Sequence, residues 1–251
     1  MTETKLYEGD IKELILRKKS SFVPNGMKST VVFEKTLYAS KKDNTKTKIA
    51  DALIFREDGV IFGIEIKTEY DQLSRLPSQL KNYSLSCDYV YVICHDKHVE
   101  KVEQVLSRYK LQHVGIIAYS NFKNRPAMGV YKEPVQSPMK TTQQSLQMLW
   151  KMELVKILGA FNHVVPRIDE FKNPEDFVHQ RLSRKVGEPK QAYSFSSKMT
   201  KIQLANNIIA RVGEKEAAKI LCDIFINNKF HPERSIKLHH FHPSKLDRGE
   251  D

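Results

Sequence analysis

The sequence predicts an α/β protein in which a mixed β-sheet flanked by helices is followed by a small all-helical C-terminal domain. Up to about residue 132, short runs rich in β-branched and aromatic residues alternate with segments of helical periodicity. This alternation is typical of a sheet covered by helices on both faces. Beyond about residue 140, apolar residues recur at helical spacing. A chain of 251 residues can form one large domain or two small ones.

The first expected element is a helix from Leu6 to about Lys18, because Ile11, Leu14 and Ile15 recur at helical spacing. The next elements are expected as a strand at 30–38, a polar loop at 40–47, strands at 49–55 and 60–67, a helix at 71–83, a strand at 89–94, a helix at 97–109, and a strand at 114–119 that pairs with 128–131. Pro77 lies inside the helix at 71–83, which predicts a kink or a late helix start.

Prolines mark the boundary between the two parts, since Pro126, Pro134 and Pro138 lie in one polar stretch. The predicted division is a sheet domain at 1–135, a linker at 136–143, a helical domain at 144–230 and a basic, histidine-containing tail at 231–251. Helices are expected at 145–161, 173–182, 198–212 and 214–227, with a stop at Gly213. Trp150 falls within the first of these helices, and we expect it in the core.

Charged residues interrupt the two strands of the central hairpin. Asp51 lies on the first strand, and Glu65 and Lys67 lie on the second, all within apolar runs. Burying a carboxylate or an ammonium group is costly unless it is paired or bound to a metal. A divalent-metal site explains three such groups on one hairpin.

The length of the hairpin loop decides whether the two carboxylates meet. With a three-residue loop at 57–59 and Gly59 in the left-handed conformation, Arg56 opposes Val60. Asp51 then opposes Glu65, and the side chain of Lys67 shares their face. A two-residue turn would instead place the carboxylates on opposite faces of the sheet.

An Asp followed by Glu65-Ile66-Lys67 on the neighbouring strand resembles the PD-(D/E)xK nuclease superfamily. The stretch from Gln79 to Tyr83 is similar to the Q-x-x-x-Y helix of its RecB-like members. The closest resemblance is to a small bacterial and phage group with E-I-K, an R-L-x-x-Q-x-x-x-Y helix and an L-W-[KR]-x-E-L stretch. The resemblance implies a restriction-endonuclease-like core over roughly residues 5–120, followed by the helical domain.

The resemblance also implies roles for individual residues. Asp51, Glu65 and the backbone carbonyl of Ile66 would hold Mg²⁺, with Mn²⁺ able to substitute, and Lys67 would assist the attacking water. One metal and two both fit the sequence. The further candidates are Gln79 and Tyr83 for positioning phosphate or supporting the metal, Glu8 and Glu34 as additional ligands, and Arg75 and Lys81 as contacts to the nucleic-acid backbone.

Each of these residues also has a structural interpretation without catalysis. Glu65 and Lys67 could form an ion pair, with Asp51 paired to Arg56 or Lys48. Similarly, Glu34 could pair with Lys35 or a neighbouring basic residue, Glu8 could be a solvated first-turn residue, and Gln79 and Tyr83 could serve only helix packing.

Composition favours a polyanionic partner, because 41 Lys and Arg against 30 Asp and Glu give a formal net charge of +11. Three cysteines without C-x-x-C spacing, no signal-peptide pattern and no apolar run of ~18 residues predict a cytoplasmic protein away from membranes. The predicted function is a Mg²⁺-dependent deoxyribonuclease. The alternative is a non-catalytic nucleic-acid-binding or phage or defence accessory protein with the same fold. The helical domain could mediate a homodimer or a larger complex.

Overall fold

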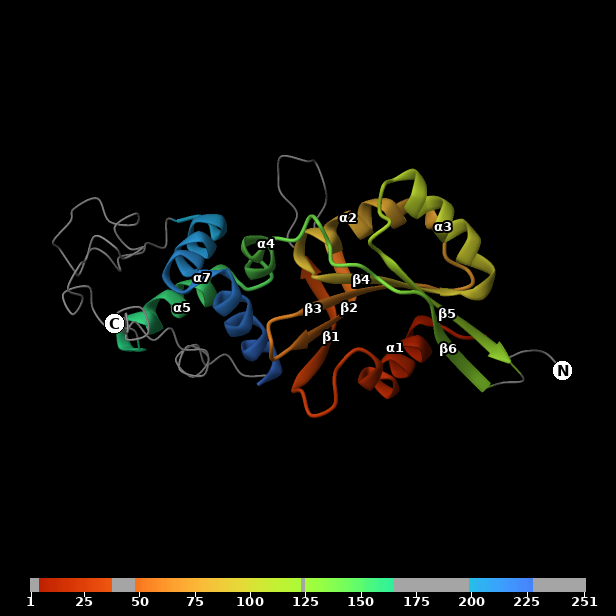
Figure 1. Ribbon diagram of the computed structural model, residues 1–251, viewed down its shortest axis with the longest axis horizontal. Helices are drawn as coiled ribbons and strands as arrows, with labels where there is room; N and C mark the ends of the chain where they lie inside the picture. The colour runs from red at the N-terminus through yellow and green to blue at the C-terminus, as the bar shows by residue number, and fades with distance from the viewer. Residues whose placement is uncertain (1–4, 38–47, 123–124, 165–198, 228–251) are drawn as a thin grey trace, which may run out of the picture.

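The protein is built around one six-stranded mixed sheet (Figure 1). The computed structural model describes residues 5–37, 48–122, 125–164 and 199–227. The strands follow chain order across the sheet as β1 (Ser29–Leu37), β2 (Lys48–Arg56), β3 (Ile61–Lys67), β4 (Tyr89–His95), β5 (Gly115–Phe122) and β6 (Arg125–Lys132). β3, β4 and β5 are parallel to one another, and the other neighbouring pairs are antiparallel. The predicted α/β class and mixed sheet are confirmed.

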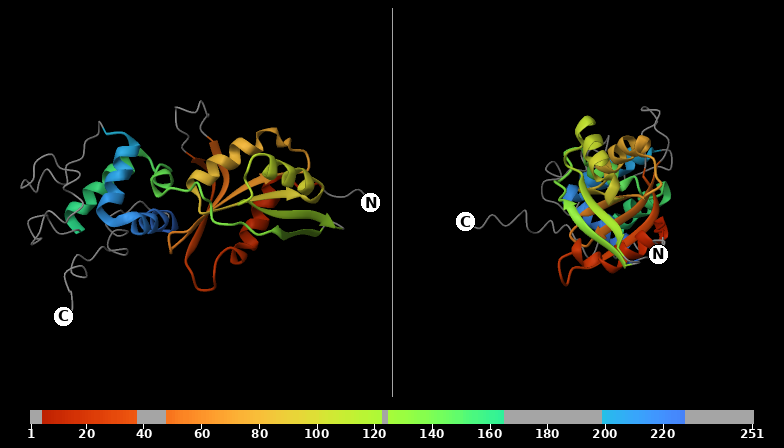
Figure 2. Two further views of the ribbon diagram at one scale, coloured as in Figure 1. Left: turned by 45° about the horizontal axis from the view of Figure 1, so that its top comes forward. Right: turned by 90° about the vertical axis from the view of Figure 1, so that its right-hand side faces the viewer.

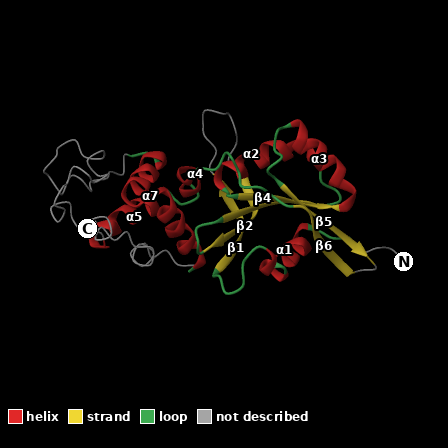
Figure 3. Ribbon diagram, in the orientation of Figure 1, coloured by secondary structure: helices red, strands yellow, loops and turns green. Residues whose placement is uncertain are grey.

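Helices cover both faces of this sheet (Figure 3). On one face α1 (Glu8–Arg17) packs Ile11 and Ile15 into an apolar cluster with Ile54 and Ile64. The other face carries α2 (Leu76–Ser86) and α3 (Val99–Arg108), each preceded by a short 3₁₀ turn, η3 (Leu73–Arg75) and η4 (Asp96–His98) respectively. Another 3₁₀ turn, η1 (Lys19–Ser21), follows α1. Two separate clusters of apolar side chains, one on each face, therefore hold the sheet.

The expected late start of the helix after β3 is confirmed. α2 begins at Leu76, and Pro77 occupies its first turn, where a missing N–H costs nothing and the fixed φ of proline suits a helix. α2 leads from the end of β3 to the start of β4, which is parallel to β3 with Phe62 beside Tyr89. The helix therefore runs antiparallel to β3.

The register of the β2–β3 hairpin agrees with the three-residue loop. Gly59 has a φ of 92°, and its N–H donates to the carbonyl of Arg56 at 3.0 Å. The N–H of Arg56 donates to the carbonyl of Val60, also at 3.0 Å. The paired residues run from Phe55 with Ile61 to Ala52 with Ile64. One further step along this register brings Asp51 level with Glu65.

The C-terminal helical part differs from the sequence prediction at Trp150. The single helix expected at 145–161 is two helices, α4 (Thr142–Leu146) and α5 (Lys151–Val164). Trp150 lies directly before α5 with its N–H bonded to Glu153 Oε2 at 2.6 Å, and its side chain is 72% exposed. The expectation that Trp150 is a core residue was wrong, because its position caps a helix and does not continue one.

The last described helix, α7 (Lys201–Ile226), contains the predicted break at Gly213, whose φ of 80° is not helical. The arm before Gly213 packs with α4 and α5, and the arm after it packs on β2. There the ring of Phe225 stacks on Phe55 at 4.1 Å between centroids. Figure 2 shows this helical part beside the end of the sheet that carries the hairpin turn.

The helical part and the sheet share one apolar cluster, which contains Leu53 and Leu80 together with Leu158 and Leu221. The stretch between β6 and α4 is bonded to the core, for example through the N–H of Ser137 and the carbonyl of Asp88 at 2.8 Å. The proposed domain boundaries stay a prediction. The expected loop at 40–47, the helix at 173–182 and the tail at 231–251 lie outside the described residues.

Candidate functional site

The candidate site lies where β2 and β3 stop pairing with each other. Beyond the pair Ala52–Ile64, backbone groups of the two strands form hydrogen bonds with side chains. The N–H of Ile66 donates to Asp51 Oδ2 at 2.7 Å. The N–H of Asp51 donates to the Tyr83 hydroxyl at 2.8 Å, and this hydroxyl donates to the Ile64 carbonyl at 3.0 Å. These three bonds fix the Asp51 carboxylate and the Tyr83 ring at the point where the strands separate.

Gly63 is the residue that allows Tyr83 to reach this point. A Cβ atom at Gly63 would lie 2.4 Å from Cδ1 of Tyr83 and 2.9 Å from Sγ of Cys87. Both distances are below any real Cβ contact, so only glycine leaves room for the ring on this face of β3. Gly63 was not predicted as a site residue, although a glycine inside a buried strand signals the close approach of another group.

Glu65 and Lys67 form a buried pair on the face that α2 covers. Glu65 is 0% exposed, Lys67 is 6% exposed, and Oε1 of Glu65 accepts from Nζ of Lys67 at 2.5 Å. Oε2 of Glu65 is also buried, and it accepts no hydrogen bond from the residues that the structure describes. The neighbouring Tyr83 hydroxyl donates to the Ile64 carbonyl instead. One oxygen of this carboxylate is therefore buried without a hydrogen-bond donor among the described residues.

Both carboxylates hold protons more tightly than usual. Burial, and then the charge of Asp51, raise the pKa of Glu65 to about 7, while Lys67 and the Tyr83 hydroxyl oppose the shift. Burial also raises the pKa of Asp51, against the hydrogen bond from the Ile66 N–H and the charge of Lys67. One ammonium group therefore does not balance the buried carboxylate of Glu65 and the half-buried carboxylate of Asp51. An additional cation, or a proton, is needed to do so.

Gln79 offers a second unpaired oxygen near this pair. Its Oε1 is buried and has no hydrogen-bond partner among the described residues. It precedes Tyr83 by about one helical turn, and Tyr83 lies over Gly63. Because α2 runs antiparallel to β3 and one turn matches about two strand residues, Gln79 lies level with Glu65.

The residues present fit a hard divalent cation. Carboxylate, amide and carbonyl oxygens are the ligands that Mg²⁺ prefers, and it commonly keeps several waters. A strand residue directs its N–H and C=O toward the same neighbouring strand. The carbonyl of Ile66 therefore faces the gap that its N–H shares with Asp51. The described residues contain no group of three or more His, Cys, Asp or Glu side chains arranged for a metal, so water and carbonyl ligands would complete the shell.

Glu8 and Glu34 converge on Lys12 of α1. Nζ of Lys12 lies 2.8 Å from Glu8 Oε1 and 3.0 Å from Glu34 Oε1. Glu34 has a φ of 53° and lies between the pairs Phe33–Ala52 and Lys35–Ala50, which places it level with Asp51 on the neighbouring strand. The structure thus shows the ion pair with a neighbouring basic residue that we considered for Glu34, and it brings Glu8 into the same pair.

The remaining candidates lie outside this centre. Arg75 and Lys81 are exposed, the first at the end of η3 and the second on α2. Arg56 pairs with Asp58 of the hairpin turn. The Glu65–Lys67 ion pair, which we considered as the alternative to a metal site, is present, but among the side chains that the structure describes it leaves Oε2 of Glu65 and the carboxylate of Asp51 without an ion pair.

Comparison with known proteins identifies the family. A family model described as bacteriophage P4 protein cII matches residues 1–225, which include the whole sheet and nearly all of α7. Neither the curated proteins nor the solved structures include a match. Among the described helices, none is both long and apolar enough to span a membrane. The chain belongs to the bacteriophage P4 protein cII family.

Proposed function

We propose that this chain is a metal-dependent nuclease of the PD-(D/E)xK type that hydrolyses phosphodiester bonds of DNA. The observation that carries the proposal is the fully buried Glu65, which lies between Asp51 and Lys67 with one oxygen unpaired. A buried carboxylate with a raised pKa, beside a second carboxylate and a lysine, is typical of a functional site. The restriction-endonuclease-like core belongs to the same proposal, and the mixed sheet with helices on both faces supports it.

The residues divide into binding and positioning roles. Asp51, Glu65 and the Ile66 carbonyl would hold Mg²⁺, which supplies Lewis acidity and lowers the pKa of a bound water. Glu65 holds the ammonium group of Lys67 at 2.5 Å, where it can orient the attacking water or balance charge on the phosphate. Tyr83 is a positioning residue, because its hydroxyl is bonded to the backbone of β2 and β3.

Cleavage of supercoiled plasmid and of single-stranded DNA, each with Mg²⁺, Mn²⁺ or EDTA, tests the proposal. The expected result is cutting that requires the metal and stops in EDTA. DNA binding without cutting under any of these conditions would favour the second candidate function, a non-catalytic nucleic-acid-binding protein. The net charge of +11 and the Glu65–Lys67 ion pair, which gives both residues a structural role, support that alternative.

Mg²⁺ is expected to stabilise the protein against thermal unfolding, and more strongly at pH 8 than at pH 5.5. The pKa of Glu65 is about 7 in the folded chain, against 4.5 for a free glutamate. Without metal, the stability that protonated Glu65 contributes is present below pH 4.5 and is lost as the pH rises through about 7. At pH 8 the metal replaces the missing proton, whereas at pH 5.5 the proton competes with it.

The measurement is differential scanning fluorimetry of the wild type and of Glu65→Gln at both pH values, with EDTA or Mg²⁺. At a tenfold excess of Mg²⁺ over its dissociation constant, the stabilisation is about 1.4 kcal/mol, which corresponds to a few degrees. The variant should show no difference between EDTA and Mg²⁺. An equal effect of Mg²⁺ at both pH values, or in the variant, would speak against a metal at Glu65.

A further inference from the structure

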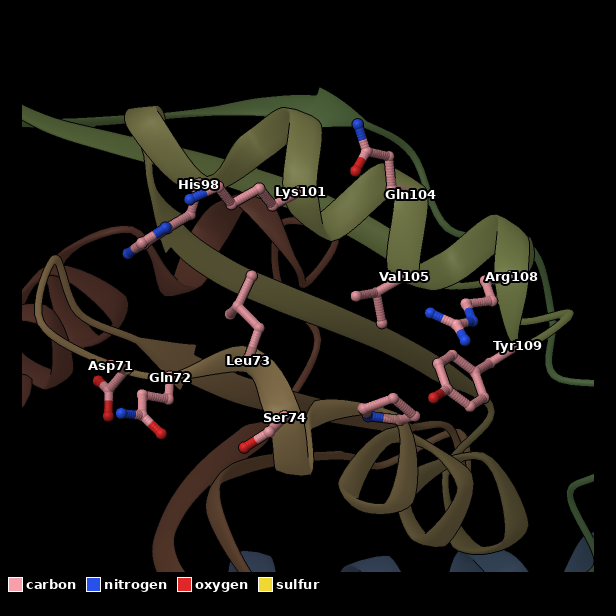
Figure 4. Close-up of a pocket in the computed structure, with 11 residues that line it drawn as sticks. Asp71, Gln72, Leu73, Ser74, His98, Lys101, Gln104, Val105, Arg108 and Tyr109 are labelled. Atoms are coloured by element: carbon pink, nitrogen blue, oxygen red, sulfur yellow. The ribbon is translucent and has the colours of Figure 1, made fainter.

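A groove lies beside the candidate site, between the start of α2 and one face of α3 (Figure 4). Its volume is about 630 Å³, within the range of small-molecule sites in proteins. Apolar groups line its interior, from Leu73 and Pro77 on one wall to Val105 on the other. In Figure 4, Leu73 and Val105 point toward each other across the space.

The wall formed by α3 is a single helical stripe. Lys101, Gln104, Val105 and Arg108 all line the groove, and their spacing of three, four and seven residues places them on one face of the helix. The acidic residues of α3 lie off this stripe, and Glu103 accepts a hydrogen bond from Tyr131 at 3.3 Å. The helix thus directs its basic groups toward the groove.

The opposite wall adds polar groups with little free negative charge. Asp71 is the acidic residue among those that line the groove, and its Oδ2 accepts from the backbone N–H and the hydroxyl of Thr68 at 2.7 Å and 2.6 Å. Gln72 and Ser74 lie beside it with amide and hydroxyl groups. His98 lies at one end and contacts the Glu69 carbonyl at 3.0 Å. The lining is therefore basic and amide-rich around an apolar centre.

The groove and the candidate site are linked at the end of β3. Asp71 is bonded to Thr68, which directly follows Lys67 at the end of β3. On α2, Pro77 lines the groove, whereas Gln79, two residues later and therefore on the opposite side of the helix, is level with Glu65. A chain molecule that leaves the groove past Asp71 would pass the end of β3, the strand that carries Glu65 and Lys67.

We propose that this groove binds a nucleotide of single-stranded nucleic acid, next to the phosphodiester that lies at Asp51 and Glu65. Tyr109, at the end of α3, is 41% exposed, and Arg108 lies over its ring at 5.8 Å. An unpaired base can stack on this aromatic group and on the apolar lining, while Lys101 and Arg108 neutralise phosphates. A base within a duplex cannot enter a groove between two helices without leaving its stack, which selects single strands. This inference rests on the proposed function.

The test is equilibrium binding of a fluorescein-labelled 20-nucleotide single-stranded DNA and of the corresponding duplex, in EDTA so that nothing is cut. The double variant Lys101→Gln/Arg108→Gln should bind the single strand at least about tenfold more weakly than the wild type. The slope of log affinity against log salt concentration should become less steep by about 1.4, or 0.7 for each lost phosphate contact. Its affinity for the duplex should not change. The matched control is Arg17→Gln/Lys215→Gln, which removes the same charge from exposed positions on α1 and α7 and should bind like the wild type.

A second variant separates stacking from charge. Tyr109→Leu keeps an apolar side chain but removes the ring, so single-strand affinity should fall by about fivefold or more with the salt dependence unchanged. Unchanged binding in both groove variants, or an equal loss for duplex and single strand, would overturn the inference. If the wild type cleaves DNA but the groove variants bind single strands normally, the groove is not the binding site, and the proposed nuclease activity stands. If the groove variants lose binding but the wild type does not cleave DNA, the groove is a binding site, and the proposed nuclease activity is wrong.

Discussion

Glu65→Gln is expected to lower Mg²⁺-dependent cleavage by roughly 1,000-fold or more, which corresponds to about 4 kcal/mol of transition-state stabilisation. Glutamine has the shape of glutamate but lacks the charge that would hold both the metal and the ammonium group of Lys67. Cleavage of supercoiled plasmid under single-turnover conditions measures the effect. Lys67→Ala should cause a comparable loss of cleavage, since it removes the group that would face the water or the phosphate in the proposed reaction.

The control for this experiment is Glu57→Gln, an equivalent change in the loop between β2 and β3. Glu57 Oε1 accepts from the N–H of Lys28 at 2.9 Å, far from the gap where the strands separate. This variant should cleave like the wild type. Near-wild-type activity in Glu65→Gln, in a protein whose circular dichroism is unchanged, would contradict the assignment of Glu65 as a metal ligand.

Gly63→Ala is expected to lower the free energy of unfolding by about 3 kcal/mol, because a group forced into a packed core displaces its neighbours. The new Cβ would lie 2.4 Å from the ring of Tyr83. The ring would have to move, and its hydroxyl would then lose the Asp51 N–H and the Ile64 carbonyl. Urea unfolding measures the stability, and we expect cleavage to fall with it because Asp51 is no longer held.

Gly129→Ala on β6 is the matched control for this substitution. A Cβ atom at Gly129 would meet nothing within 4 Å, so its stability should change by less than about 0.5 kcal/mol. Removing the ring in Gly63→Ala/Tyr83→Ala tests the cause. If the clash with the ring is responsible, the double variant should be less destabilised than the sum of the two single variants. Additive effects would show that the cost of Gly63→Ala arises elsewhere.

The hairpin register follows from two local rules once the loop has three residues, a length that the sequence left open beside a two-residue turn. Side chains of a strand alternate between faces, and Gly59 has access to the left-handed conformation that closes a three-residue loop. These rules place Asp51 and Glu65 on one face without any knowledge of the remaining chain. The late start of α2 followed from Pro77 in the same local way.

The contacts that complete the site depend on residues distant in sequence, and apart from Gly63 inside β3 local patterns carry no signal for them. The Tyr83 hydroxyl bonds to two strands, and Lys12 joins Glu8 to Glu34. The groove likewise combines residues of α2 and α3, which come together because both helices pack on the same face of the sheet.

Trp150 was placed wrongly for a different reason. The apolar spacing on both sides of it continues through the break between α4 and α5. The feature that ends the pattern is the side chain of Glu153, which accepts a hydrogen bond from the Trp150 N–H before the first turn of α5. Periodicity predicts where a face is apolar, but it did not show that this helix begins anew.

The bend of α7 at Gly213 determines which part of this chain must be kept together when the candidate site is transferred to another protein. Its second arm covers the hairpin loop, where a Cβ on Gly59 would lie only 3.1 Å from the backbone nitrogen of Lys219. Fusing or exchanging the sheet alone would strip this cover from the turn that sets the positions of Asp51 and Glu65. A unit that keeps this cover would therefore extend to Ile226, one residue beyond the residues that the family model matches.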